Sequence, residues 1–159
     1  MTNKIYLYGI SALALAVLAI MFLRYDTSKP LTDFPEEKNQ QEFTVKYPEG
    51  YKVYSTAPDV ITVENEAGQG FQIAVTAFDE SGPITPERIQ QDLPDAEINE
   101  PGLAKLDGEQ TLVFYGYDED LGDTFEAWVV HNGKLYQIMS AKSDENMLES
   151  VLDTWKWSE

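Results

Sequence analysis

The stretch TFEAWVVHNGKLYQIM, residues 124–139, decides the fold. Two alternating apolar runs flank Asn132-Gly133, a dipeptide that is the strongest short-range signal for a β-hairpin. A two-residue turn at this point pairs Ala127 with Ile138. One face of the hairpin then carries Phe125, Ala127, Val129, Tyr136 and Ile138, and the other carries Trp128, Val130, Leu135 and Met139. Because both faces are apolar, the hairpin predicts a sheet with helices packed on both sides.

The segments around this hairpin predict an α+β domain with a mainly antiparallel sheet. Strands are expected over residues 43–47, 51–54, 60–64, 71–78 and 110–117, with short pieces over 96–98 and 104–106. Thr85-Pro86-Glu87 is typical of a helix start, and Pro94 ends that helix. A second helix is expected over 144–153 with Ser143 as its cap, followed by a final strand at 155–157.

The stretch EFTVKYPEGYKV, residues 42–53, is expected to form the opening hairpin of the domain. Phe43, Val45 and Tyr47 alternate with polar residues and therefore point to one side of a strand. A Pro-x-Gly turn follows, and a second alternating run begins directly after it.

The amino-terminal part of the chain predicts a membrane anchor. Residues 5–23 contain no charge, and about 20 such residues span a hydrocarbon core of ~30 Å. The run is longer than the apolar part of a signal peptide, and no small-residue cleavage site follows it. We therefore expect a short cytoplasmic tail at 1–4, a transmembrane signal anchor at 5–24, a flexible linker at 25–41 and an extracytoplasmic domain at 42–159. This places the protein in the cell membrane as a single-pass protein.

The charge distribution excludes one class of partner. All 28 acidic residues and 9 of the 11 basic residues lie beyond the expected anchor at 5–24, which leaves that part with a net charge of −19. Such a charge repels phosphate backbones, so nucleic-acid binding is not expected. The chain has no cysteine, so it has neither disulfides nor thiolate chemistry.

Three separated motifs resemble the PsbP-like family. They are FTVKYPEGY at residues 43–51, KLYQI at 134–138 and TWKW at 154–157. The resemblance covers the whole domain and implies an α-β-α sandwich around an antiparallel sheet. Members of that family include extrinsic photosystem proteins and many bacterial proteins, often membrane-attached, which are generally binding or assembly proteins. The membrane anchor and the stronger acidity of this chain argue against a photosystem role.

The acidic loop at residues 118–123 is the best candidate for metal chemistry. Asp118, Asp120 and Asp123 are clustered carboxylates of the kind that calcium prefers, since calcium takes six to eight oxygen ligands. The spacing differs from an EF-hand loop, and a solvated acidic loop explains the same residues. No other cofactor is expected.

The aromatic residues offer a second candidate site. Trp128, Trp155 and Trp157 are a candidate platform for a ligand or a protein partner, although aromatic residues at a spacing of two are usually core. The single histidine, His131, lies beside the predicted turn and is expected to be solvated. The usual nucleophile and base pairs are absent from the sequence.

The sequence favours a membrane-tethered extracytoplasmic binding or assembly module, not an enzyme, with a protein partner that the residues do not identify. One alternative is a calcium-dependent structural module that uses the loop from Asp118 to Asp123. The other is a hydrolase with paired carboxylates such as Glu126 and Asp118. A hydrolase requires a carboxylate-lined cleft, and none is expected.

Overall fold

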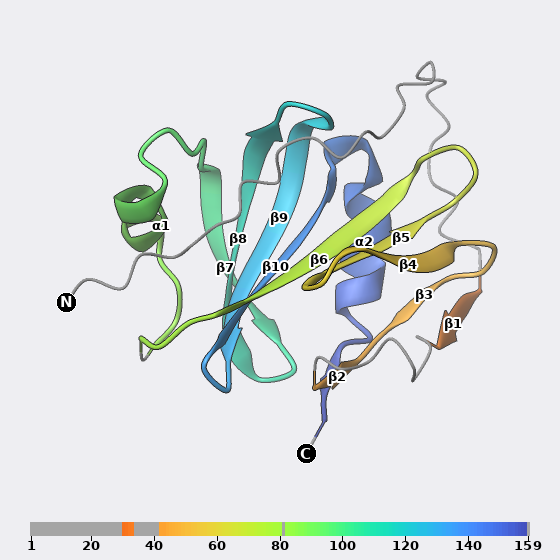
Figure 1. The fold of residues 1–159 in the computed structure, drawn as a ribbon, viewed down its shortest axis with the longest axis horizontal. Coiled ribbons are helices and arrows are strands. Elements are labelled where there is room, and N and C mark those ends of the chain that lie inside the picture. The colour runs from red at the N-terminus through yellow and green to blue at the C-terminus, as the bar shows by residue number, and fades with distance from the viewer. Residues whose placement is uncertain (1–29, 34–41, 81, 159) are drawn as a thin grey trace.

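The computed structural model describes residues 30–33, 42–80 and 82–158 (Figure 1). The predicted cytoplasmic tail at 1–4 and the predicted transmembrane anchor at 5–24 lie outside these residues. Within the described ranges, no helix is long and apolar enough to cross a membrane.

The described chain forms strands and three short helical segments. In chain order they are β1 (Leu31–Asp33), β2 (Phe43–Thr44), β3 (Lys46–Pro48), β4 (Lys52–Ala57), β5 (Val60–Glu64), β6 (Gly70–Ala77), α1 (Pro86–Asp92), β7 (Asn99–Leu106), β8 (Glu109–Asp118), β9 (Gly122–His131), β10 (Lys134–Ala141), the 3₁₀ turn η2 (Lys142–Asp144), α2 (Glu145–Leu152) and β11 (Lys156–Trp157).

Seven strands form one antiparallel sheet in the order β4-β5-β6-β10-β9-β8-β7. The central hairpin has the predicted register, with Ala127 opposite Ile138 and Val130 opposite Leu135. The turn residues Asn132 and Gly133 both have positive φ angles, 47° and 73°, as a two-residue hairpin turn requires. The hairpin prediction is confirmed.

Each face of the sheet carries a helix and a buried cluster. α2 lies behind the sheet in Figure 1 and packs on β10 and β6. The cluster on its side includes Phe43, Val45, Phe71, Phe125, Ala127, Val129, Tyr136, Ile138, Met147, Leu148, Val151 and Trp155. The cluster beneath α1 comprises Phe78, Ile84, Ile89, Leu112, Phe114, Trp128 and Leu135. Helices therefore cover both faces, as the two apolar sides of the hairpin predict.

A side chain caps the start of α1 but not the start of α2. Thr85 caps α1 as expected, because its hydroxyl accepts a hydrogen bond from the backbone N–H of Arg88 at 3.2 Å. The expected cap at Ser143 is wrong. Residues 142–144 form η2, and α2 begins at Glu145 without a side-chain cap. A tertiary contact decides this start, since the buried Asp144 carboxylate accepts a hydrogen bond from β6 instead.

The predicted opening hairpin is also wrong. β3 pairs with β1, β2 pairs with β11, and β4 joins the edge of the large sheet beside β5. Phe43 and Val45 do point inward as expected, with exposed fractions of 0% and 2%. They pack against the carboxy-terminal part of the chain, where Phe43 stacks on Trp155 with ring centroids 4.1 Å apart. β2 and β3 therefore pair with β11 and β1 and not with β4.

Two further segments differ from the prediction. Leu31–Asp33, within the segment expected to be a flexible linker, forms β1 against β3, so the linker prediction needs correction at these three residues. The two short pieces expected at 96–98 and 104–106 are replaced by one strand, β7, with a bulge between Asn99 and Gly102. β7 is an edge strand, and its outer side has no neighbouring strand among the described residues.

Candidate binding groove beside α2

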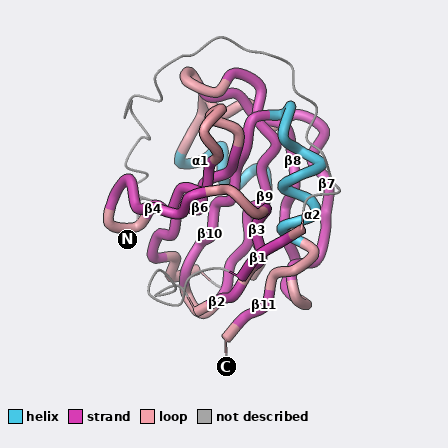
Figure 2. Tube along the Cα trace, turned by 90° about the vertical axis from the view of Figure 1, so that its right-hand side faces the viewer, coloured by secondary structure: helices cyan, strands magenta, loops and turns pink. Residues whose placement is uncertain are grey.

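The helix α2 covers only part of its face of the sheet. It packs on β10, β6 and β3, whereas β7 and β8 lie at the end of the sheet. Figure 2 shows α2 on the same side of the molecule as β7 and β8. Between them lies an open groove of about 670 Å³, within the size range of ligand sites in proteins.

Apolar side chains form the floor of this groove. Ala104 on β7, Val113 on β8, Phe125 on β9 and Leu152 on α2 all line it. Val113 and Leu152 are only partly buried, at the margin of the cluster beneath α2. The core of the domain therefore reaches the surface here.

The wall of the groove is acidic. Glu145, Glu149 and Asp153 follow one another at intervals of four residues along α2 and its end, and all three line the groove. Carboxylates four apart on a helix repel each other by about 0.2–0.5 kcal/mol per pair, and a negative charge at a helix C-terminus is also unfavourable. No salt bridge to these three residues is found in the described part of the chain. Glu149 and Asp153 therefore cost the free protein some stability, whereas Glu145 lies in the first turn of α2, where a negative charge is favourable.

Tyr115 connects the floor to the acidic wall. Its hydroxyl donates a hydrogen bond of 2.6 Å to Glu145 Oε1. This bond is the main reason that the pKa of Tyr115 is raised to about 12, and burial and the negative charges of Glu145, Glu100 and Glu149 add to the effect. Carboxylates of β7 and of α2 therefore both raise the pKa of this one hydroxyl.

An ion pair also lines the groove. Lys156 Nζ lies 2.6 Å from Asp107 Oδ1, and Asp107 Oδ2 accepts a hydrogen bond from the backbone N–H of Trp157. The hydrogen bond from Lys156 is the main cause of the lowered pKa of Asp107. This pair neutralises itself, so the negative field of the groove comes from Glu100 and from the three acids along α2.

The acidic loop between β8 and β9 is organised by its own backbone. Asp118 Oδ1 accepts hydrogen bonds from the backbone N–H groups of Asp120 at 2.9 Å and Leu121 at 3.0 Å. Across the described ranges, no three Asp, Glu, His or Cys side chains are grouped so as to hold a metal ion. Asp118, Asp120 and Asp123 thus share a loop, and the geometry gives no support to calcium binding there.

The structure does not bring the three tryptophans onto one surface. Trp128 is 6% exposed, packs edge-on against Phe114 and belongs to the cluster beneath α1. Trp155 and Trp157 lie on the other side of the sheet, with ring centroids 5.4 Å apart. Trp155 is 1% exposed, so Trp157 is the only one of the three outside the buried set.

The expectation that His131 is solvated is wrong. Its ring stacks on Trp157 with centroids 4.0 Å apart, and its Nδ1 lies 3.1 Å from Glu109 Oε1. The side chain is only 14% exposed. The final strand β11 carries Trp157 over the hairpin shoulder, a long-range contact that the local turn pattern does not reveal.

Glu126, half of the carboxylate pair considered for hydrolysis, is held within the sheet. Thr124 Oγ1 and Trp128 Nε1 each donate a hydrogen bond of 2.8 Å to its carboxyl group. Burial is the main reason that its pKa is raised, and the charge of Asp118 raises it further. The two acids are therefore close enough to interact, but neither lines the groove.

The groove itself corrects one prediction, because a carboxylate-lined cleft was not expected. The acids that line it were missed as a set, although the spacing of Glu145, Glu149 and Asp153 was visible in the sequence as an acidic stripe beside the apolar stripe of α2. That stripe was the available signal. What it did not reveal is that α2 leaves β7 and β8 uncovered.

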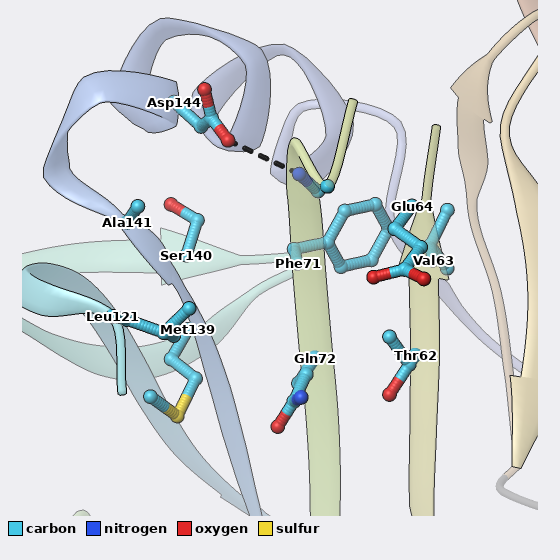
Figure 3. Close-up of a pocket in the computed structure, with 12 residues that line it drawn as sticks. Thr62, Val63, Glu64, Phe71, Gln72, Leu121, Met139, Ser140, Ala141 and Asp144 are labelled. Carbon is cyan, nitrogen blue, oxygen red and sulfur yellow. Dashed lines mark hydrogen bonds between the residues drawn. The ribbon is translucent and has the colours of Figure 1, made fainter. Parts of the chain in front are cut away.

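A second cavity is much smaller, about 20 Å³, and lies where β5, β6 and β10 meet η2 (Figure 3). Asp144 and Ser140 line it, and burial raises the pKa of the Asp144 carboxyl. The Ser140 hydroxyl has no hydrogen-bond partner among the described residues. This volume suits a single water molecule.

The antiparallel sheet with one helix on each face places this domain in the α+β class. Neither a protein-family model nor a curated protein matches the sequence. The fold is similar to the solution structure of cyanobacterial PsbP (CyanoP) from Synechocystis sp. PCC 6803, with a TM-score of 0.54, 12% sequence identity, and coverage of 80% of this chain and 92% of that one. The chain therefore has a PsbP-like fold, as the three sequence motifs predict.

A second solved structure is also similar. It is a crystal structure at 1.50 Å resolution from Bacteroides thetaiotaomicron VPI-5482, with a TM-score of 0.52 and 14% identity. The match covers 74% of this chain and 46% of that one, so this chain spans less than half the length of the Bacteroides protein. At these identities both similarities concern the fold.

Proposed function

We propose that this chain is a membrane-tethered extracytoplasmic binding or assembly module without a catalytic activity of its own. The observation that carries the proposal is the groove beside α2, where core side chains reach an uncovered surface lined with carboxylates. An apolar centre with a polar rim is the usual composition of a protein-binding surface. The tether is supported by the charge-free run at residues 5–23.

The positions of the acids favour binding over hydrolysis. Acid–base catalysis by two carboxyl groups needs both in one cleft, one of them with a raised pKa. The carboxyl groups of Glu126 and Asp144 have raised pKa values, and neither lines the groove. The acids that do line it face a surface with room for side chains of a partner.

The test is to cross-link the full-length chain in its own membrane and to identify the proteins that co-purify with it. A binding or assembly module should retain a small, reproducible set of partners after high-salt and detergent washes. Recovery of only abundant membrane proteins, at the ratios found with an unrelated anchored domain, would contradict the proposal. Extraction at alkaline pH tests the tether separately, since an integral protein stays with the membrane and a peripheral one is released.

A further inference from the structure

The groove beside α2 is selective in the charge that it accepts. Glu100 on β7 and Glu145, Glu149 and Asp153 along α2 line it, whereas Lys105 is the only lining cation that forms no salt bridge among the described residues. An anionic surface, such as a nucleic acid or an acidic membrane, is repelled by this arrangement. Charge complementarity requires a cationic occupant.

The floor adds a second requirement. Ala104, Val113 and Leu152 present apolar surface between the acidic wall and the edge strand β7. A purely hydrophilic cation would leave this surface wet and would gain little from the groove over any other acidic site. The occupant therefore needs apolar groups that alternate with its positive charges.

A segment of a protein chain meets both requirements. Its lysine or arginine side chains supply the positive charge, and apolar side chains between them supply the groups that cover the floor.

We infer that the groove between α2 and β7–β8 is the docking site for a basic, amphipathic peptide segment of a protein partner. Its lysine or arginine side chains lie against the acids of α2 and its apolar side chains lie on Ala104 and Val113. This inference rests on the proposed binding function and specifies its site and the chemistry of its partner.

The experiment measures binding of a short synthetic peptide of alternating lysine and leucine to the full-length chain, purified in a neutral detergent, by isothermal titration calorimetry. One comparison peptide has glycine in place of leucine and the other has glutamate in place of lysine. The lysine–leucine peptide should bind at least about tenfold more tightly than either, since both charge and apolar contact are needed. Equal binding of the lysine–glycine peptide would overturn the inference, because attraction would then be charge alone.

Variants locate the binding. The double variant Glu145→Gln, Glu149→Gln removes two charges and still offers an acceptor to the Tyr115 hydroxyl, and it should weaken the peptide roughly fivefold. The matched control Glu97→Gln, Glu119→Gln removes two exposed charges outside the groove. Equal weakening by this control would overturn the proposed site.

A second variant tests the groove without changing its charge. Ala104 is exposed on β7, so Ala104→Trp fills the floor with a ring that the fold can accommodate, and peptide binding should be lost. Unchanged binding would place the peptide elsewhere. In the membrane cross-linking experiment, a Glu145→Gln, Glu149→Gln chain that retains the wild-type partners refutes the docking site alone. A wild-type chain without specific partners refutes the proposed function itself.

Discussion

Asp144 Oδ2 accepts a hydrogen bond from the backbone N–H of Gly70 at 3.1 Å, across 74 positions of sequence. This bond holds the start of β6 against the turn that leads into α2. The Asp144 side chain is buried, and the residue is 4% exposed. Burial raises the pKa of its carboxyl above the ordinary value of 3.8, and hydrogen bonds from Gly70 and Ser143 offset only part of that rise.

The raised pKa has a defined effect on stability. A carboxyl whose pKa is higher in the folded state contributes most below its unfolded pKa, and that contribution is lost as the pH rises through the folded value. Asp144→Asn removes the titration and keeps an acceptor for Gly70. The stability of this variant relative to wild type should therefore increase between about pH 3 and about pH 7, as measured by denaturant unfolding at both pH values. Asp120→Asn controls for the loss of one charge, and a relative decrease for Asp144→Asn would show that the folded state favours the carboxylate.

Gly70 itself has no room for a side chain. A Cβ atom at this position overlaps the carbonyl oxygen of Val63 on the neighbouring strand β5, and backbone cannot move aside without breaking the sheet. Gly70→Ala should lower the free energy of unfolding by about 3 kcal/mol. Gly102→Ala is the matched control, because its Cβ would meet Val113 Cγ2 at 3.4 Å and should cost less than about 0.5 kcal/mol. Similar losses for both variants in urea titrations would contradict the steric account.

The stack between Phe43 and Trp155 joins the first strand of the domain to its last residues. The rings lie 4.1 Å apart with an interplanar angle of 16°. Trp155→Ala should cost about 3–5 kcal/mol because it leaves a large cavity. Trp155→Phe keeps an aromatic ring on Phe43 and removes an unpaired buried donor, so it should cost less than about 1.5 kcal/mol. If the two substitutions destabilise equally in denaturant unfolding, the stack is not what holds this position.

Calcium should leave the thermal stability unchanged. The Asp118 carboxylate accepts hydrogen bonds from the backbone of its own loop, and among the described residues no three acids are grouped so as to hold a metal ion. We expect the same melting temperature with and without about 1 mM calcium at constant ionic strength, the affinity range of extracellular calcium modules. A calcium-induced rise that disappears when all three residues are changed to asparagine would establish the calcium-dependent alternative.

The sequence predicts those parts of the fold that depend on neighbouring residues. The Asn132-Gly133 turn, the strand alternation around it and the Thr85 cap all follow from local chemistry, and all agree with the structure. The misplaced elements depend on distant partners. β3 pairs with β1 and not with the strand that follows it. α2 begins beside Asp144, which bonds to Gly70, and Ser143 does not cap it.

The candidate sites also differ in whether their residues are neighbours in the sequence or are brought together by packing. The acids at 118–123 stand together in the sequence, and the structure uses one of them to form the turn. The acids of the groove come from β7 and from α2, which are separated by β8, β9 and β10. The packing position of α2 brings Glu145 into a hydrogen bond with the Tyr115 hydroxyl, whose pKa the charge of Glu100 also raises. Periodicity shows which face of a helix is buried but not how much of a sheet the helix covers.

The pairing of β2 with β11 fastens the two ends of the domain to each other. Phe43 lies opposite Trp157, and the backbone N–H of Ser158 donates a hydrogen bond of 2.8 Å to the carbonyl oxygen of Glu42. A fluorescent reporter or affinity tag fused after Ser158 would therefore begin beside the point where the chain enters the domain. Distances measured from such a fusion would describe the surroundings of Glu42, and probes of the groove need attachment points on β7 or α2.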